Sequence, residues 1–545
     1  MQERSPADLI VASSAVIGEE GTALSKKGKK KAEKRNAKAQ RQQEVALAVQ
    51  QAQNASVDMN KVATSFEDDT FGLWPLIQSS SFSSRQWVTL KNVNTSLIDQ
   101  PIWIRARLQS SRRKGAICFV VLRHQLYTLQ CVLDGNKNVS KDMLRWTAAL
   151  PLESIVDIYG FVSKPDIEIT ATTQKVEICV EKFFCMSKAT SELPFQLKDA
   201  NTPDTAEGDE VIVVNQDTRL DNRILDLRTM ANQSIFRLQS EIGRHFREFL
   251  REREFIEIHS PKLLGGASEG GSACFMLDYF NRKACLAQSP QLYKQMVLCG
   301  DMDRVFEVGP VFRAENSNTH RHLCEFVGLD LEMVFMEHYF EVLDLMDALF
   351  QYIFQQIITH SQNEIDIIHR QHPASPFVWI EKTPRLEFVQ AVEFLREFGC
   401  EDIPEDPQQF DLSTEHEKLL GKIIKEKYGT DFYILIRFPL KWRPFYSMPC
   451  PDDPTFSNSY DFFMRGEEIL SGAQRIHDSL FLTQRAMECG IPIDTVKAYL
   501  DSFSLGVCPH AGCGIGLERV LMLFLGLSNV RKTSLFPRDP KRLEP

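Results

Sequence analysis

The sequence predicts a multidomain chain in which a small all-β barrel precedes a larger α+β domain, with a basic extension at the N-terminus. Two observations support this fold class. Short β segments follow one another between residues 85 and 190, whereas helical and strand patterns are mixed between residues 229 and 545. The chain has 545 residues, of which 43% are hydrophobic and 25% charged, so it can bury more than one core and is not wholly disordered.

Residues 1–70 form the predicted flexible extension, which is rich in Ala, Gln and Lys and nearly free of aromatic residues. Nine basic residues and one acid, Glu33, lie within residues 25–41, although the whole chain has a net charge of -10. An acidic body with a basic arm indicates contact with a polyanion through a local patch. Two interpretations stay open: a solvated, partly helical tail, or a basic helix that lies along nucleic-acid phosphates.

Residues 85–190 have the pattern of a small barrel such as an OB-fold. Apolar Ile102 and Ile104 alternate with Trp103 and Arg105, as expected for a strand with one buried face. Arginines near aromatic residues provide the mixture that base stacking and phosphate contact require. Strands are expected over residues 102–107, 116–122, 126–133, 154–162 and 175–184.

Residues 191–228 are polar and acidic and contain Pro194, Pro203 and Gly208, a composition that predicts a hinge or linker. The remaining chain, residues 229–545, begins with apolar residues spaced mostly by three and four, which predict an amphipathic helix. Two strands and a second helix are expected downstream, over residues 304–312, 323–335 and 340–358.

The strand expected over residues 323–335 has two different faces. Its apolar face consists of Val327, Leu329, Leu331, Met333 and Phe335. The other face carries Phe326, Gly328, Asp330 and Glu332. An aromatic ring, a glycine and two carboxylates on one face are unusual for a surface exposed only to solvent, so this face is a candidate binding surface.

Two arginine-bearing segments surround this strand in the sequence. The loop at residues 312–322 presents Arg313 and Arg321 at a hairpin mouth, and arginine binds phosphate in a forked geometry. A glycine run at residues 512–516 leads into an apolar helix that begins near Arg519, and glycines let a ligand approach the backbone closely. The sequence has neither a Walker A motif nor a dinucleotide fingerprint, so a nucleotide would be held by arginines.

Composition also bears on the compartment. The 13 cysteines are scattered and form no C-x-x-C pair, which argues against disulfides and structural zinc and favours a reducing environment. The longest apolar runs are too short to span a bilayer. We therefore expect a cytoplasmic protein without a membrane partner.

The motifs resemble those of the class II aminoacyl-tRNA synthetases. Residues 312–315 with Arg321 and His322 are similar to motif 2, residues 514–519 to motif 3, and residues 257–261 to motif 1 with its dimer-interface proline. An OB-fold before the catalytic domain is the arrangement of the aspartyl, asparaginyl and lysyl subclass. The stretches that resemble cytoplasmic aspartyl-tRNA synthetases most closely, including their tRNA-binding appendix, are residues 24–31, 267–271, 288–295, 459–461 and 466–475.

The resemblance implies a catalytic domain with a mainly antiparallel sheet and an ATP-dependent ligation of L-aspartate to tRNA(Asp) through an aspartyl-adenylate. It also implies Mg²⁺ as a cofactor and a homodimer. An asparaginyl-tRNA synthetase and a catalytically inactive tRNA-binding relative are the alternatives. Lys294 argues against the first, and Arg313, Glu468 and Arg519 argue against the second.

The resemblance further assigns roles to single residues. The catalytic residues are Arg313, Arg519 and Glu468. The ATP-binding residues are Arg313, Glu315, Arg321, His322, Leu323, Phe326, Glu468, Gly516 and Arg519. Aspartate binding falls to Glu269, Gln291, Lys294, Arg313, Asp330, Ser471 and Arg475. The anticodon is read by Phe119, Gln130 and Glu177, and the metal is bound by Asp461 and Glu468.

Two features of these assignments need structural explanation. Cys513 stands where the family pattern has glycine; a small side chain there should be tolerable, but it could crowd the ATP site. Strand alternation places Ser471 and Arg475 on one face but Glu468 on the other, so a bend is required between them.

Overall fold

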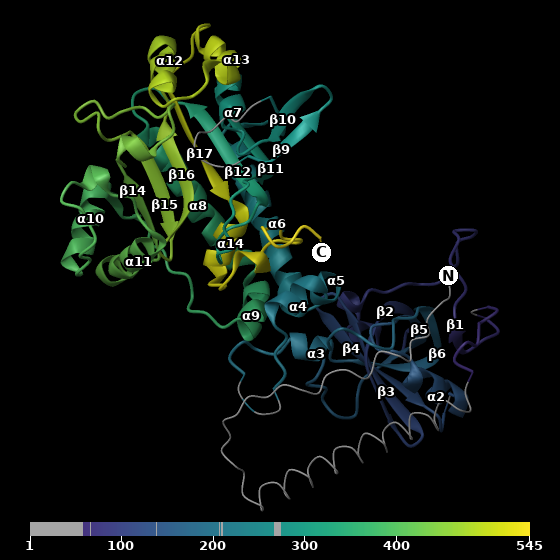
Figure 1. Cartoon of the computed structure of the whole chain (residues 1–545). Coiled ribbons are helices and arrows are strands. Elements are labelled where there is room, and N and C mark those ends of the chain that lie inside the picture. Colours follow the sequence, from purple (N-terminus) through teal and green to yellow (C-terminus); the bar gives the residue numbers. More distant parts are fainter. Residues whose placement is uncertain are drawn as a thin grey trace, which may run out of the picture. The chain divides into compact units, whose positions relative to one another are not determined.

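The computed structural model describes residues 58–65, 67–137, 139–206, 208, 211–265 and 274–544 (Figure 1). The basic run of the extension and the predicted ligand Glu269 lie outside these ranges. The chain divides into two compact units, Met1–Glu192 and Leu193–Pro545. Within the described ranges, no helix combines the length and the apolar character needed to cross a membrane.

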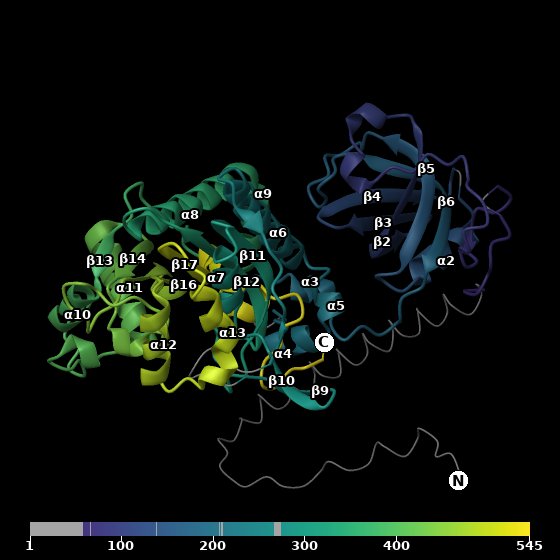
Figure 2. The ribbon, with the colours of Figure 1, turned by 90° about the horizontal axis from the view of Figure 1, so that it is seen from above.

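The first unit is a closed β-barrel, as predicted. β2 pairs with both β3 and β5, and β5 pairs in turn with β6, so the sheet closes on itself (Figure 2). A short β1 (Phe71–Leu73) adds to β6 in parallel. The barrel strands are β2 (Pro101–Lys114), β3 (Ile117–His124), β4 (Tyr127–Asp134), β5 (Ile155–Ser163) and β6 (Glu177–Ser187).

Two parts of the barrel differ from the expectation. β2 continues well past residue 107, because a bulge between Leu108 and Ser110 shifts the alternation on which the prediction relied. A helix, α2 (Lys141–Ala149), was not predicted. It is capped by Ser140, whose Oγ accepts a hydrogen bond from the Met143 amide, and it buries Trp146 completely in the barrel core.

The second unit is built on an eight-stranded sheet with the order β13-β14-β15-β16-β17-β12-β11-β7. Only the β13–β14 and β11–β7 pairs are parallel, which confirms the mainly antiparallel sheet. The strands are β7 (Ile256–Glu257), β11 (Arg304–Phe312), β12 (Glu325–Val334), β13 (Arg385–Glu387), β14 (Phe432–Ile436), β15 (Ser459–Met464), β16 (Glu467–Gln474) and β17 (His510–Gly516).

The main core lies between one face of this sheet and four helices, α6 (Met230–Arg251), α8 (Phe340–His360), α9 (Gln362–Gln371) and α14 (Leu517–Leu525). The predicted helices at residues 229 onward and 340–358 are confirmed as α6 and α8. The apolar face of β12 contributes Leu329, Leu331 and Met333 to this core. The opposite face of β12, with Asp330, is therefore free to build a site.

Smaller elements surround the sheet. β13, β14, α10 (Phe388–Glu397) and α11 (Thr414–Tyr428) share a separate core, and we call these four elements the α10–α11 module. Helices α7 (Gln291–Leu298), α12 (Ser479–Glu488) and α13 (Ile493–Phe503) share another. A three-stranded sheet is formed by β8 (Leu263–Leu264), β9 (Met276–Tyr279) and β10 (Arg282–Leu286).

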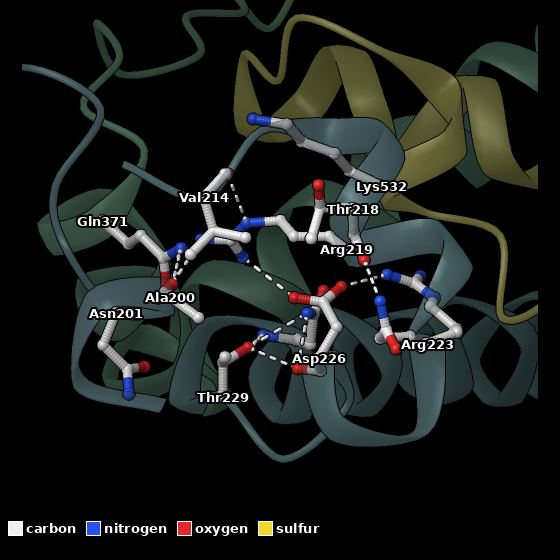
Figure 3. Close-up of polar contacts among 12 residues, drawn as sticks. Ala200, Asn201, Val214, Thr218, Arg219, Arg223, Asp226, Thr229, Gln371 and Lys532 are labelled. Carbon is white, nitrogen blue, oxygen red and sulfur yellow. Dashed lines mark hydrogen bonds and ion pairs between the residues drawn. The ribbon is translucent and has the colours of Figure 1, made fainter. Parts of the chain in front are cut away.

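The segment expected as a linker contains three short helices, α3 (Leu197–Ala200), α4 (Gln216–Asp221) and α5 (Arg223–Asp226). Arg219 and Arg223 both bond Asp226, at 2.9 and 2.6 Å (Figure 3). Arg223 also donates to the carbonyl oxygens of Ser534 and Leu535, at 2.7 and 2.9 Å. These bonds join the segment to the C-terminal part of the second unit.

We predict that Arg223→Ala destabilises the second unit by about 3 kcal/mol, because it removes a buried partner of the Asp226 carboxylate and the donor to the carbonyls of buried Ser534 and of Leu535. Urea unfolding followed by intrinsic fluorescence measures the change. Lys198→Ala, at an exposed position of α3, serves as the control and should cost less than 1 kcal/mol. A loss no greater than that of the control would contradict a stabilising role for the Arg223 contacts.

Candidate active site

A pocket of about 370 Å³ lies on the polar face of β12. Its walls come from the loop between β11 and β12, from β16 and β17, from the start of α14, and from the loop before β15. Five of its lining residues are arginines, namely Arg313, Arg321, Arg443, Arg475 and Arg519. Four are acidic, namely Glu315, Asp330, Glu468 and Glu518. Such a lining suits an anionic ligand that also carries an ammonium group or a bound cation.

All nine residues predicted to bind ATP line this one pocket. Arg313 is anchored through its backbone amide, which donates to the Cys324 carbonyl at 2.9 Å, and its guanidinium lies 5.6 Å from the Phe326 ring centroid. Its buried Nε has no hydrogen-bond partner among the described residues. A buried donor without a partner is costly, so an anion that accepts from Arg313 would be bound favourably.

Arg519 lies in the first turn of α14. Its Nη1 donates to the Glu468 carbonyl at 2.9 Å, and its Nη2 donates to the Arg321 carbonyl at 3.3 Å. Both bonds go to backbone oxygens, and no carboxylate pairs directly with this guanidinium in the described parts of the chain. Burial lowers the pKa of Arg519, which shows that its positive charge is held in a desolvated place.

The other motif 2 residues line the same side of the pocket. His322 Nδ1 lies 2.6 Å from Thr319 Oγ1, and its Nε2 lies 4.0 Å from Glu315 Oε2. Burial and the nearby Arg519 lower the pKa of His322 below that of a free imidazole. A neutral imidazole can donate one hydrogen bond to a phosphate without adding a further charge.

The predicted aspartate site is a cluster of four buried charges. Lys294 Nζ, on α7, lies 3.1 Å from Asp330 Oδ1, 3.4 Å from Glu332 Oε2 and 2.8 Å from the Cys513 carbonyl. Arg475 bonds Glu332 through Nε at 2.8 Å and the Gly512 carbonyl through Nη2 at 2.8 Å. The resemblance placed Asp330 and two cations, Lys294 and Arg475, in this site. Glu332 was not assigned to the site, and with Asp330 it balances both of them.

The electrostatics of the two carboxylates differ. Burial raises the pKa of Asp330, although Lys294 opposes the shift. Burial also acts to raise the pKa of Glu332, but Arg475 and Lys294 outweigh it, so the pKa is lowered. Gln291 accepts from Arg475 Nη2 at 3.4 Å and borders both the cluster and the pocket. Glu332 is therefore a fixed counter-ion, whereas Asp330 lines the pocket and is available to a ligand.

Glycines of β17 make room for these acids. A Cβ atom on Gly512 would collide with the Glu332 carboxylate, and one on Gly514 would lie 3.1 Å from Asp330 Oδ1. Cys513 lies between them in the strand, so its side chain points to the other face, into the core that contains Leu331. The expectation that Cys513 could crowd the ATP site is therefore wrong. Burial raises the pKa of this thiol to about 12.

The required bend before Ser471 is present as a β-bulge. Phe462 pairs with Leu470, but Phe463 pairs with Glu468, so Ile469 is the extra residue. The bulge reverses the alternation and brings Glu468 to the face that carries Ser471 and Arg475. All three residues line the pocket.

The two predicted metal ligands have different surroundings. Both carboxylate oxygens of Asp461 are bonded by Arg443, at 2.9 and 2.6 Å, and Arg443 also donates to Ser471 Oγ at 2.8 Å. Glu468 is half-buried, and desolvation, with the nearby charge of Asp461, raises its pKa to about 7. A carboxylate that lines the pocket suits a hard divalent cation, so Glu468 fits a magnesium ligand and Asp461 fits a supporting position. No sequence signal pointed to Arg443.

One further carboxylate borders the pocket without having been predicted. Both oxygens of Glu518 accept from the Val327 amide, at 3.2 and 3.1 Å, next to Phe326, which the resemblance assigned to ATP binding. Val327 lies just beyond the last β12 residue paired with β17, so the Glu518 side chain continues the ladder in place of a backbone carbonyl. Burial raises the pKa of Glu518 to about 7.

In the barrel, the predicted anticodon residues come from three adjacent strands. Gln130 on β4 donates to Glu177 Oε2 on β6 at 2.9 Å. Phe119 on β3 pairs with Val132, two positions along β4 from Gln130, so its ring is on the same face. All three side chains are partly exposed. They form a half-exposed aromatic and polar surface, which is the type that stacks on bases.

Comparisons with known proteins agree with this architecture. Residues 215–540 match the family of class II tRNA synthetases (D, K and N), and residues 102–184 match the OB-fold nucleic acid binding domain. The chain is 51% identical over 504 residues to the cytoplasmic aspartate–tRNA ligase of Homo sapiens. This alignment covers 92% of this chain and 99% of that protein. It is 45% identical to the cytoplasmic aspartate–tRNA ligase 1 of Arabidopsis thaliana, in an alignment that covers 98% of this chain and 99% of that protein.

Solved structures give the same result. The crystal structure of a putative aspartyl-tRNA synthetase from Leishmania major Friedlin superposes with a TM-score of 0.83 at 46% identity, over 87% of this chain and 98% of that one. The asparaginyl-tRNA synthetase of Pyrococcus horikoshii complexed with asparaginyl-adenylate superposes with a TM-score of 0.73 at 26% identity. The superposition covers 84% of this chain and 100% of that chain.

We predict that Glu518 reduces stability as the pH rises. With a pKa of about 7 in the folded state against 4.5 for an ordinary glutamate, the folded chain binds the extra proton between these values, so stability falls across this window. Glu518→Gln removes this effect and keeps an acceptor for Val327. Relative to wild type, its unfolding free energy should improve by roughly 3 kcal/mol from pH 4 to pH 8. Denaturation at both pH values tests this, and a pH-independent difference contradicts it.

Proposed function

The chain belongs to the cytoplasmic aspartate–tRNA ligases, within the class II synthetases, and we propose that it joins L-aspartate to tRNA(Asp) through an aspartyl-adenylate. ATP is consumed, and AMP and diphosphate are released. The names of the relatives place them in the cytoplasm, and we assign this chain to the same compartment. The single observation that carries the proposal is a charge-balanced site built around Lys294 and Arg475, which adjoins an arginine-lined nucleotide pocket.

In the first step, an oxygen of the aspartate α-carboxylate attacks the α-phosphorus of ATP, and the bond from that phosphorus to the diphosphate oxygen breaks. We assign to Arg313 the α-phosphate and the attacking carboxylate, because its Nε is buried without a partner. Arg519 stabilises the charge that develops toward the leaving diphosphate, and Phe326 stacks on adenine. Positioning and charge neutralisation supply the catalysis, so no enzyme nucleophile is needed.

Aspartate recognition follows from the charge-balanced cluster. The α-ammonium group pairs with Asp330, which lines the pocket, and with Glu269. The side-chain carboxylate takes donors from Arg475 and Lys294, with Gln291 and Ser471 beside it. Asparagine has a neutral amide in place of this carboxylate. Its binding would leave Lys294 and Arg475 with one fewer anionic partner in a desolvated site, so binding of asparagine is strongly unfavourable.

Mg²⁺ is the proposed metal, with Glu468 as its main protein ligand and Asp461 in support. When bound, it would neutralise part of the triphosphate charge. Desolvation and the charge of Asp461 raise the pKa of the Glu468 carboxyl to about 7, so binding of the metal would compete with protonation of this group.

The remaining assignments concern the substrate tRNA and assembly. We propose that the barrel, residues 85–190, reads the anticodon through Phe119, Gln130 and Glu177, and that the basic extension, residues 1–70, adds phosphate contacts. Residues 191–228 connect the barrel to the catalytic domain, residues 229–545. A homodimer is proposed through the region of Pro261, which corresponds to motif 1.

Pyrophosphate exchange with aspartate, asparagine and lysine as separate substrates tests the function. We expect exchange with aspartate and at least a hundredfold less with the other two. Arg519→Ala should lose on the order of 3 kcal/mol of transition-state stabilisation, or about a hundredfold in rate, while its unfolding midpoint stays near wild type. Exchange that prefers asparagine, or that survives in Arg519→Ala, would refute the assignment.

We further predict that the cation of Arg475 sets the choice of amino acid. In the double variant Arg475→Met and Glu332→Gln, a cation and its paired acid are removed together, so the buried charge stays balanced. Exchange with aspartate should fall at least a hundredfold and exchange with asparagine much less. Glu332→Gln alone is the control and should keep the preference for aspartate. A constant ratio of the two rates in the double variant would remove Arg475 from substrate recognition.

A further inference from the structure

Arg321, which lines the triphosphate side of the pocket, is held by an acid from outside it. Its Nη1 donates to Oε2 of Glu417, which lies on α11 of the α10–α11 module. Only 13% of the Arg321 side chain and 8% of the Glu417 side chain are exposed. Among the described residues, no other partner binds the Arg321 side chain, so its Nε and Nη2 are available to a ligand.

Glu417 itself occupies a fixed position. The Ser413 side chain caps α11 by accepting from the His416 amide at 3.2 Å, which places Glu417 in the first turn at the positive end of the helix dipole. One turn further on, Gly421 packs directly on Gly466 in the turn between β15 and β16, where a Cβ atom would strike the Gly466 backbone. Helix α11 therefore packs closely against the β15–β16 hairpin, which carries Glu468.

Arg321 is also connected to the other proposed triphosphate ligand. The Arg321 carbonyl accepts from Arg519 Nη2 at 3.3 Å. A shift of Arg321 would therefore move the backbone oxygen on which Arg519 rests. Glu417, Arg321 and Arg519 thus form one chain of contacts that runs from the module to the pocket.

We propose that Glu417 is a positioning residue for aspartate activation. It holds one nitrogen of the Arg321 guanidinium so that the remaining donors face the β- and γ-phosphates of ATP. Glu417 does not line the pocket, and the side-chain hydrogen bond that connects it to a pocket residue goes to Arg321. Sharing is chemically reasonable, because a guanidinium has five donors and this carboxylate uses one of its nitrogens. The inference rests on the proposed function, which supplies ATP as the ligand.

The competing explanation is that the pair only stabilises the module, and two nucleotides separate the explanations. Isothermal calorimetry compares α,β-methylene-ATP, which keeps a full triphosphate and resists cleavage at the α-phosphate, with AMP, which lacks the phosphates that Arg321 would bind. Glu417→Ala should weaken the ATP analogue about tenfold and change AMP less than twofold. Glu417→Gln should lie closer to wild type, because its amide oxygen can still accept from Arg321.

Two further variants complete the design. Asp431→Asn alters another acid that pairs with α11, through Lys425 at 2.6 Å, and should bind both nucleotides like wild type. In an Arg321→Met background, Glu417→Ala should have no additional effect on the ATP analogue, because the residue through which it acts is already gone.

The outcomes are distinct. Equal weakening of the ATP analogue and AMP in Glu417→Ala would show a purely structural pair, and unchanged binding of both would show no role in nucleotide binding; either result overturns the inference. An additional loss in the Arg321→Met background overturns it as well. The proposed function is tested separately by aspartate-dependent exchange in the wild-type enzyme, so active wild type with a normal Glu417→Ala would reject this inference alone.

Discussion

The mutual compensation of four buried charges is the constraint on which the catalytic unit depends. Lys294, Asp330, Glu332 and Arg475 lie in a place from which water is excluded, and a single one of them without its partners would be strongly destabilising. Their arrangement requires three strands and α7 to meet at one point. It also requires glycine at positions 512 and 514, because the acids of β12 lie across β17. The site and the sheet therefore have to form together.

This compensation divides the pocket into two halves of different character. The proposed amino-acid half is charge-balanced before any ligand arrives. Once a ligand's ammonium group pairs with Asp330, a side-chain carboxylate would restore the balance of charge and an amide would not. The proposed nucleotide half holds Arg313 and Arg519, whose guanidinium groups are bonded to backbone oxygens or incompletely satisfied. That half attracts a polyanion without first breaking a strong ion pair. One half that discriminates between amino acids and another that attracts the negative charge of a nucleotide suit an enzyme that must choose one amino acid but always uses the same nucleotide.

The sequence predicted the architecture well because its signals are local. Alternation along β12 identified both faces of the strand, and the barrel strands β3 to β6 appear within a few residues of the predicted bounds. Eight of the nine predicted ATP residues come from two short segments, residues 313–326 and 516–519, and Glu468 comes from a third, so one resemblance located them together. What could not be predicted depends on distant parts of the chain. Arg443 and Glu417 reach the site through tertiary packing, and nothing in their own neighbourhoods marks them. Glu518 lies within the motif 3 segment, but its contact with the Val327 amide depends on the fold. Strand alternation showed that a bend was required before Ser471, but only the paired strand shows that Ile469 is the extra residue.

The orientation of Cys513 has a consequence for the redox chemistry of the enzyme. Thiolates, not thiols, react with peroxides and electrophiles, and a thiol with a pKa of about 12 is almost entirely protonated at neutral pH. Cys513 also faces an apolar core in which such reagents have no access. We therefore expect that oxidants do not inactivate the enzyme through Cys513, although this residue belongs to a strand of the active site. β17 tolerates a cysteine at position 513 because this side chain points into the core, whereas Gly512 and Gly514 occupy the face of the strand that borders the buried acids.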